Sequence, residues 1–228
     1  MNAVRARVSG KLRERTISAI ALGLVMIGAA TAPAATLKVT VRTPEGKPLV
    51  GAVITALRKD AHDRPASPVK AAISQVDLTF KPDLLVVPVG SSVEFPNNDT
   101  VSHQIYSFSS AKRFQLPLYR GTPYPPVRFD QPGLVTLGCN IHDAMLAYIV
   151  VTDAPHFGRS DTVGGWTALD VTPGNYHVLI WHPRLRDAPA ALERDVTVSE
   201  GDNTLDVKLN KSLRPAPITD RPHSWDAY

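Results

Sequence analysis

The 228-residue sequence contains a single cysteine, Cys139, and only three methionines. A lone cysteine excludes disulfides within the chain, and it argues against a structural zinc site, which usually uses several cysteines and no methionine. No basic stripe interleaved with aromatic residues is present that would indicate nucleic-acid binding. The presence of this cysteine in the segment "GCNIHDAMLAYIVV" (138–151) therefore has to be explained.

Long apolar runs are also absent, apart from "ISAIALGLVMIGAA" near the N-terminus. Five basic residues precede this run: Arg5, Arg7, Lys11, Arg13 and Arg15. Ala32 and Ala34 follow it as an A-x-A site, which predicts a secretory signal cleaved after Ala34, since cleavage after Ala32 would leave a proline first. A retained membrane anchor is the alternative, although the run is short for a bilayer span. We expect a periplasmic protein with no membrane span after cleavage.

Without residues 1–34, the chain carries almost no excess of positive or negative charge. The formal net charge of +4 arises from 25 Lys and Arg against 21 Asp and Glu. Residues 1–34 hold five of the basic residues and one acid, Glu14, so the remainder is nearly neutral. The high isoelectric point therefore does not indicate binding to nucleic acid or to an anionic membrane.

The sulfur that remains after cleavage is concentrated in one place. Met1 and Met26 leave with the signal, and Met145 then lies six residues after Cys139 with His142 midway between them. In an oxidising compartment thiols usually pair, so an unpaired one requires a function. Packing alone does not explain this grouping.

Short runs of alternating apolar residues recur between Pro and Gly turns, which is typical of an all-β protein. "TLKVTVRT" (36–43) and "LVGAVITALRK" (49–59) are predicted as the two strands of a hairpin. Further strands are expected throughout 74–152, where a Greek-key sandwich or barrel is the default, and again in 165–185 and 194–210. No convincing amphipathic helix interrupts them.

Cys139, His142 and Met145 form C-x2-H-x2-M on a short loop between two predicted strands, so the loop can direct all three side chains to one point. A second imidazole is available from His103, which follows "FPNNDTVS" at the start of another strand. Two histidines, one cysteine and one distant methionine are the ligands of a blue copper electron-transfer site. Bound metal would keep the thiol deprotonated and out of disulfide exchange.

Each of these residues taken alone fits ordinary packing, and only their joint spacing indicates a metal. Nucleophilic catalysis by Cys139 with His142 lacks an orienting acid and an oxyanion hole, so we expect no enzymatic activity. The other histidines lie in predicted loops, in the strand segment 165–185 or in the tail. We expect none of them to be ligands: His62, His156, His177, His182 and His223.

Both segments resemble the cupredoxins, the family of plastocyanin, amicyanin and pseudoazurin. Their first signature, F-x-P-x-x-L-x-V-x-x-G-x-x-V-x-F-x-N-x-D-x-x-x-H, corresponds to "FKPDLLVVPVGSSVEFPNNDTVSH", which ends at His103. Their second ends C-x2-H-x(2–4)-M-x-G-x-I-x-V and corresponds to "CNIHDAMLAYIVV", with the spacing of amicyanin and Ala147 in place of the usual glycine. Gln104 stands where asparagine commonly follows the first copper histidine, which leaves the reduction potential open.

The resemblance implies a Greek-key cupredoxin sandwich that holds one type 1 copper ion. The ligands would be His103, Cys139 and His142 in a plane, with Met145 as the long axial ligand. It also implies that the second histidine lies at the surface within an apolar patch, for which the candidates are Ile141, Ala144 and Leu146.

Sequences on either side of this segment resemble a carboxypeptidase regulatory-like β-domain, its opening in "VTVRTPEGKPLVGAVITALRK" and its closing half in "DTVGGWTALDVTPGNYHVLIWHP". We therefore expect one smaller β-sandwich into which the copper domain is inserted; the alternative is two independent sandwiches. The predicted division is a signal peptide (1–34), a first part of the regulatory-like domain (36–62), the cupredoxin domain (70–153), the remainder (160–211) and a disordered tail (212–228). The arrangement also resembles exported proteins labelled methylamine-utilisation proteins.

The favoured function is a monomeric periplasmic carrier of single electrons that contacts a dehydrogenase or cytochrome transiently. A copper delivery or storage protein would use the same ligands without redox turnover. A carbohydrate- or protein-binding β-module with a vestigial metal site is the third alternative.

Overall fold

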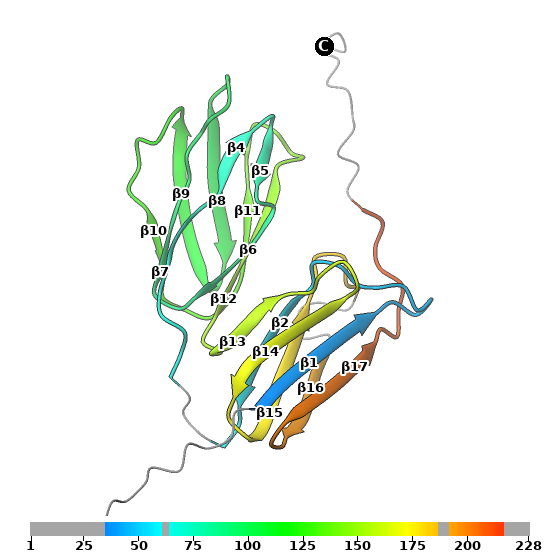
Figure 1. Ribbon diagram of the computed structural model, residues 1–228. Helices are drawn as coiled ribbons and strands as arrows, with labels where there is room; N and C mark the ends of the chain where they lie inside the picture. Colours follow the sequence, from blue (N-terminus) through cyan, green and yellow to red (C-terminus); the bar gives the residue numbers. More distant parts are fainter. Residues whose placement is uncertain (1–34, 61–63, 187–191, 217–228) are drawn as a thin grey trace, which may run out of the picture. The chain divides into compact units, whose positions relative to one another are not determined.

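The computed structural model describes residues 35–60, 64–186 and 192–216, and every regular element within these ranges is a β-strand (Figure 1). The predicted all-β class is confirmed. The predicted signal peptide, at 1–34, lies outside the described residues. Within the described ranges no helix has the length and apolar character needed to cross a bilayer.

Residues 70–152 form one β-sandwich. Its larger sheet has the order β6-β12-β11-β8-β9, with β6 at Leu84–Pro88, β12 at Leu146–Thr152, β11 at Gly133–Gly138, β8 at His103–Ser109 and β9 at Lys112–Tyr119. A smaller sheet has the order β10-β7-β3, with β10 at Val127–Phe129, β7 at Ser91–Glu94 and β3 at Lys70–Ala72. β4 (Ser74–Val76) and β5 (Thr79–Lys81) pair as a short hairpin.

The period-two pattern of the strands places one face of each in the core of this sandwich. In β8, His103, Ile105 and Ser107 are buried while Tyr106 and Phe108 are partly or largely exposed. The core is mainly aliphatic and aromatic, and it includes Cys139 and Met145. Three of the candidate ligands, His103, Cys139 and Met145, are thus buried with the apolar core.

The second β-sandwich draws on both ends of the described chain (Figure 1). One sheet has the order β14-β1-β17, with β14 at Gly165–Val171, β1 at Ala35–Arg42 and β17 at Asp202–Lys208. The other has the order β13-β2-β15-β16, with β13 at His156–Arg159, β2 at Val53–Arg58, β15 at Gly174–Trp181 and β16 at Leu192–Val198. Val39 lies opposite Trp166 and Leu205, and Arg58 lies opposite Tyr176. If the first sandwich is inserted into the second, strands that precede it must pair with strands that follow it, as β1 and β2 do here. The exact domain boundaries stay a prediction.

The predicted hairpin of 36–43 with 49–59 is wrong, because β1 and β2 belong to different sheets. After β1 the chain makes a turn closed by Thr43 N–H to the Lys47 carbonyl and pairs back only at the Arg42–Pro48 bridge. Gly51 then adopts a left-handed conformation (φ +76°), where a glycine is favoured. From there the chain enters the opposite sheet, so both strands bury apolar side chains in the same core.

The segment predicted as a disordered tail begins with ordered residues. The Arg214 N–H donates to the Arg184 carbonyl, and the Arg186 guanidinium donates to the Ser212 carbonyl. These bonds hold residues 212–216 against the turn that follows β15. The rest of the predicted tail, 217–228, lies outside the described residues.

His182, directly after β15, makes the stability of this sandwich sensitive to acid. Its Nδ1 accepts a hydrogen bond from the Arg184 N–H at 3.2 Å. Burial, and then the charge of Arg184, lower the pKa of His182 from 6.5 to about 4. Between these two pH values the unfolded chain binds a proton that the folded chain does not, so stability falls as the pH drops through this window.

We therefore expect the free energy of unfolding, measured in urea from pH 7 to pH 4, to decrease less steeply for His182→Gln than for the unsubstituted chain. The glutamine cannot take up the proton, so its linked loss of stability disappears. Parallel pH profiles for the two proteins would show that His182 does not contribute.

Candidate metal centre

Pairing between neighbouring strands brings the two candidate segments together. β8 begins at His103, β11 ends at Gly138, and the two strands pair at Gly138 opposite Tyr106. A side chain at position 138 would collide with the Tyr106 ring, because a Cβ there would lie 2.7 Å from the ring's Cζ and Oη atoms. The glycine thus allows Tyr106 to cover the backbone directly before Cys139.

The loop between β11 and β12 carries Cys139, His142 and Met145. The Met145 N–H donates to the His142 carbonyl at 2.9 Å, which closes a turn within the loop. This turn bends the chain back towards the sheet, so the cysteine and the histidine face the start of β8.

The side-chain donors of His103, Cys139 and His142 all lie within 4.8 Å of one another. The Cys139 Sγ atom is 3.9 Å from His103 Nδ1, although the two residues are 36 positions apart. His142 Nδ1 is 3.2 Å from His103 Nδ1, and the two rings meet edge to face at 64°. The structure therefore brings together three of the four residues predicted as ligands.

These three residues fit a bound metal ion. Bonds of about 2.0 Å to nitrogen and about 2.3 Å to sulfur allow one ion to bridge the 3.9 Å between Cys139 Sγ and His103 Nδ1 and the 3.2 Å between the two Nδ1 atoms. Cys139 is a free, buried cysteine. Among the described residues, no other group of three or more His, Cys, Asp or Glu side chains is close enough to hold an ion. One thiolate and two imidazoles suit copper better than a hard cation.

Met145, the fourth predicted ligand, is 2% exposed and packs in the same core cluster as Cys139. Its position at the end of the loop is compatible with a fourth ligand. Its role as the axial ligand stays a prediction.

The centre is buried on one side and accessible on the other. His103 is completely buried and Cys139 nearly so, whereas His142 is only partly buried. Ile141, directly before His142, and Leu146, the first residue of β12, are 50% and 43% exposed. Apolar side chains are therefore exposed at both ends of the segment that carries His142.

Two polar contacts surround the donors. The Asn140 amide donates to the Gln104 side-chain carbonyl at 3.2 Å, so the glutamine that replaces the usual asparagine still connects β8 to the cysteine loop. Asp99 Oδ2 lies 3.1 Å from His103 Nε2. Asp99 was not predicted as a site residue, and its place in the first signature, four residues before His103, is the signal that could have identified it.

The other histidines that the structure describes lie outside this cluster. His177 contacts Asp195 at 3.1 Å and Glu193 at 3.7 Å, and His182 serves the turn after β15. His156 rests near the Tyr176 ring in the second sandwich. His62 and His223 are not among the described residues.

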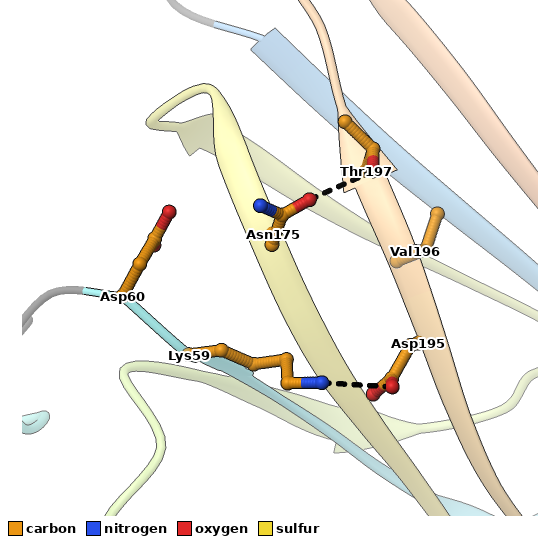
Figure 2. A pocket seen from close by; sticks show the side chains of 6 residues that line it. All are labelled: Lys59, Asp60, Asn175, Asp195, Val196 and Thr197. Atoms are coloured by element: carbon orange, nitrogen blue, oxygen red, sulfur yellow. Dashed lines mark hydrogen bonds and ion pairs between the residues drawn. The ribbon is translucent and has the colours of Figure 1, made fainter.

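A surface hollow of about 280 Å³ on the second sandwich is lined by polar side chains that pair with each other (Figure 2). The Lys59 ammonium contacts Asp195 at 2.8 Å, and the Thr197 hydroxyl donates to the Asn175 side-chain carbonyl at 2.8 Å. The hollow contains no member of the metal cluster. We therefore assign the candidate site to the first sandwich alone.

No family model matches the chain, and no curated protein matches it. Among solved structures, a purple cupredoxin from Nitrosopumilus maritimus is 23% identical, with a TM-score of 0.33, and the match covers 36% of this chain and 99% of that one. A copper-containing nitrite reductase from Thermus scotoductus is 24% identical, with a TM-score of 0.35, over 42% of this chain and 25% of the enzyme. A reduced amicyanin variant is 17% identical, with a TM-score of 0.33, over 43% of this chain and 99% of that one.

These similarities concern the fold. The strand pairing of residues 70–152 by itself describes a two-sheet β-sandwich. The donor cluster lies at one end of that sandwich, where β8 begins and β11 ends.

Proposed function

We propose that this chain is a periplasmic protein that binds one type 1 copper ion and carries single electrons between redox partners. His103, Cys139 and His142 would hold the ion, and Met145 would be a weak fourth ligand. The observation that carries the proposal is the convergence of one buried thiol and two imidazoles within 4.8 Å, from the start of β8 and from the loop between β11 and β12. Bound copper would accept and release one electron by changing between Cu(II) and Cu(I).

The chain's own contribution is to fix the donors and to exclude water. β8 and the loop before β12 hold the three donors from two sides, so their arrangement does not depend on the oxidation state of the ion. Burial of Cys139 and His103 keeps solvent from the thiolate. Small rearrangement on gain or loss of an electron would favour rapid transfer.

Electrons would leave through the accessible edge of His142. Ile141 and Leu146 give this edge an apolar rim, and a small apolar contact suits a short-lived complex. A periplasmic dehydrogenase or cytochrome is the proposed partner, and the carrier would act as a monomer without catalysis of its own. The second sandwich, with its resemblance to regulatory-like domains, would act as the scaffold into which the copper domain is inserted.

The chain purified without residues 1–34 should bind one equivalent of Cu(II) and develop an intense visible absorption from charge transfer between thiolate and copper. Cys139→Ser should abolish this absorption, because a serine hydroxyl is not ionised at neutral pH and lacks the sulfur orbital. Visible and EPR spectroscopy during a copper titration measure both effects. Colour that persists in Cys139→Ser would contradict the assignment.

Matched histidine variants sharpen this experiment. His142→Ala removes a proposed ligand, whereas His177→Ala removes a histidine of the second sandwich that contacts Asp195 and Glu193. Only the first should weaken copper binding. A protein that binds Cu(I) tightly and resists oxidation would instead be a delivery or storage protein.

Met145→Leu should retain copper but raise the reduction potential, because loss of a weak donor destabilises Cu(II) more than Cu(I). The change conserves volume in the core and should cost at most about 1.5 kcal/mol in the free energy of unfolding. Met145→Gln supplies a stronger axial oxygen and should lower the potential. Cyclic voltammetry of the three proteins measures the effect, and equal potentials would remove Met145 from the ligand set.

A further inference from the structure

Both ring nitrogens of His103 are engaged. Nδ1 faces the other donors, 3.9 Å from Cys139 Sγ and 3.2 Å from His142 Nδ1. Nε2 lies 3.1 Å from the Asp99 carboxylate. The His103 side chain is 0% exposed and that of Asp99 is 10% exposed, so water does not compete freely for this contact.

The contact with Asp99 determines where His103 carries its proton. The Asp99 oxygens already accept hydrogen bonds from two backbone groups, the Leu78 N–H at Oδ2 and the Thr100 N–H at Oδ1. An ionised carboxylate only accepts hydrogen bonds. A neutral His103 must then carry its hydrogen on Nε2, which leaves the lone pair of Nδ1 directed at the cluster.

The carboxylate is itself held in place by the backbone. The Leu78 N–H donates to Oδ2 and the Thr100 N–H to Oδ1, both at 2.8 Å. The Asp99 N–H donates to the Asn97 side-chain carbonyl at 3.0 Å. The Asn97 amide group in turn donates to the carbonyls of Val101 and Tyr119.

The Leu78 amide comes from an unusual turn. Asp77 (φ +53°) and Leu78 (φ +56°) form the two-residue connection between β4 and β5, both in the left-handed region where glycine or asparagine is usual. A branched leucine in this conformation carries backbone strain. The strained residue is the one whose N–H reaches the Asp99 carboxylate.

We propose that Asp99 is a positioning residue for the metal centre. Its carboxylate, held by the amides of Leu78 and Thr100, fixes the tautomer and the ring orientation of His103. Its negative charge, transmitted through the imidazole, would favour Cu(II) over Cu(I). The preference for Cu(II) rests on the proposed function. The tautomer of His103 is a property of the metal-free chain and does not depend on copper binding.

The tautomer is tested without any metal. In ¹⁵N-resolved NMR spectra of the metal-free chain at neutral pH, His103 should show hydrogen on Nε2 only. A spectrum with hydrogen on Nδ1 in the unsubstituted protein would overturn the proposal, whether or not the protein binds copper.

Asp99→Asn tests the role in metal binding. The amide has nearly the same shape but cannot supply two ionised acceptor oxygens, so the Nε2–H tautomer should lose its preference. The dissociation constant for Cu(II), measured by competition with a chelator of known affinity, should rise about 10- to 100-fold. The reduction potential should rise by about 59 mV for each tenfold by which the loss of Cu(II) affinity exceeds that of Cu(I).

One control separates positioning from general damage. Asp77→Asn removes a neighbouring charge that pairs with Lys81 at 2.9 Å, and it should leave the tautomer and the Cu(II) affinity unchanged. Unchanged affinity and an unchanged tautomer in Asp99→Asn would overturn the proposal, and a chain that binds no copper would instead refute the proposed function.

Discussion

The register between β8 and β11 is the constraint on which the site depends. Gly138 lies opposite Tyr106, which places the start of β8 beside the residue that follows β11. Side chains alternate along a strand, so a slip of one residue would turn His103 from the core to the opposite face. The same slip would separate its Nδ1 from the Cys139 thiol, and no adjustment of the loop alone could restore the cluster.

Burial of so many polar donors in an apolar core is costly unless each has a partner. His103 meets this requirement with Asp99 on one ring nitrogen and the donor cluster on the other. The Asp99 carboxylate accepts hydrogen bonds from the backbone amides of Leu78 and Thr100. The polar groups around the centre therefore form a connected series from the β4–β5 turn to the thiol, and the aliphatic core surrounds it.

The second sandwich shows how distant parts of a chain can build one core. β1 and β2 precede the segment that carries the candidate metal centre, yet they pair with β14, β15 and β17, which follow it. Insertion at an exposed connection leaves the pairing of the host strands intact. The proposed insertion explains why regulatory-like sequence patterns occur on both sides of a cupredoxin-like segment.

The sequence by itself determined the all-β class and the grouping of Cys139, His142 and Met145, because alternation and loop spacing are local properties of the chain. His103 could be predicted as well, since the signature over residues 80–103 ends at this histidine. Only the tertiary structure decided that β1 and β2 enter opposite sheets and that Asp99 contacts His103. Alternation identifies the buried face of a strand but not its neighbours, and the hydrogen bond to Leu78 joins Asp99 to a turn 21 residues away. Such contacts depend on how the whole chain packs.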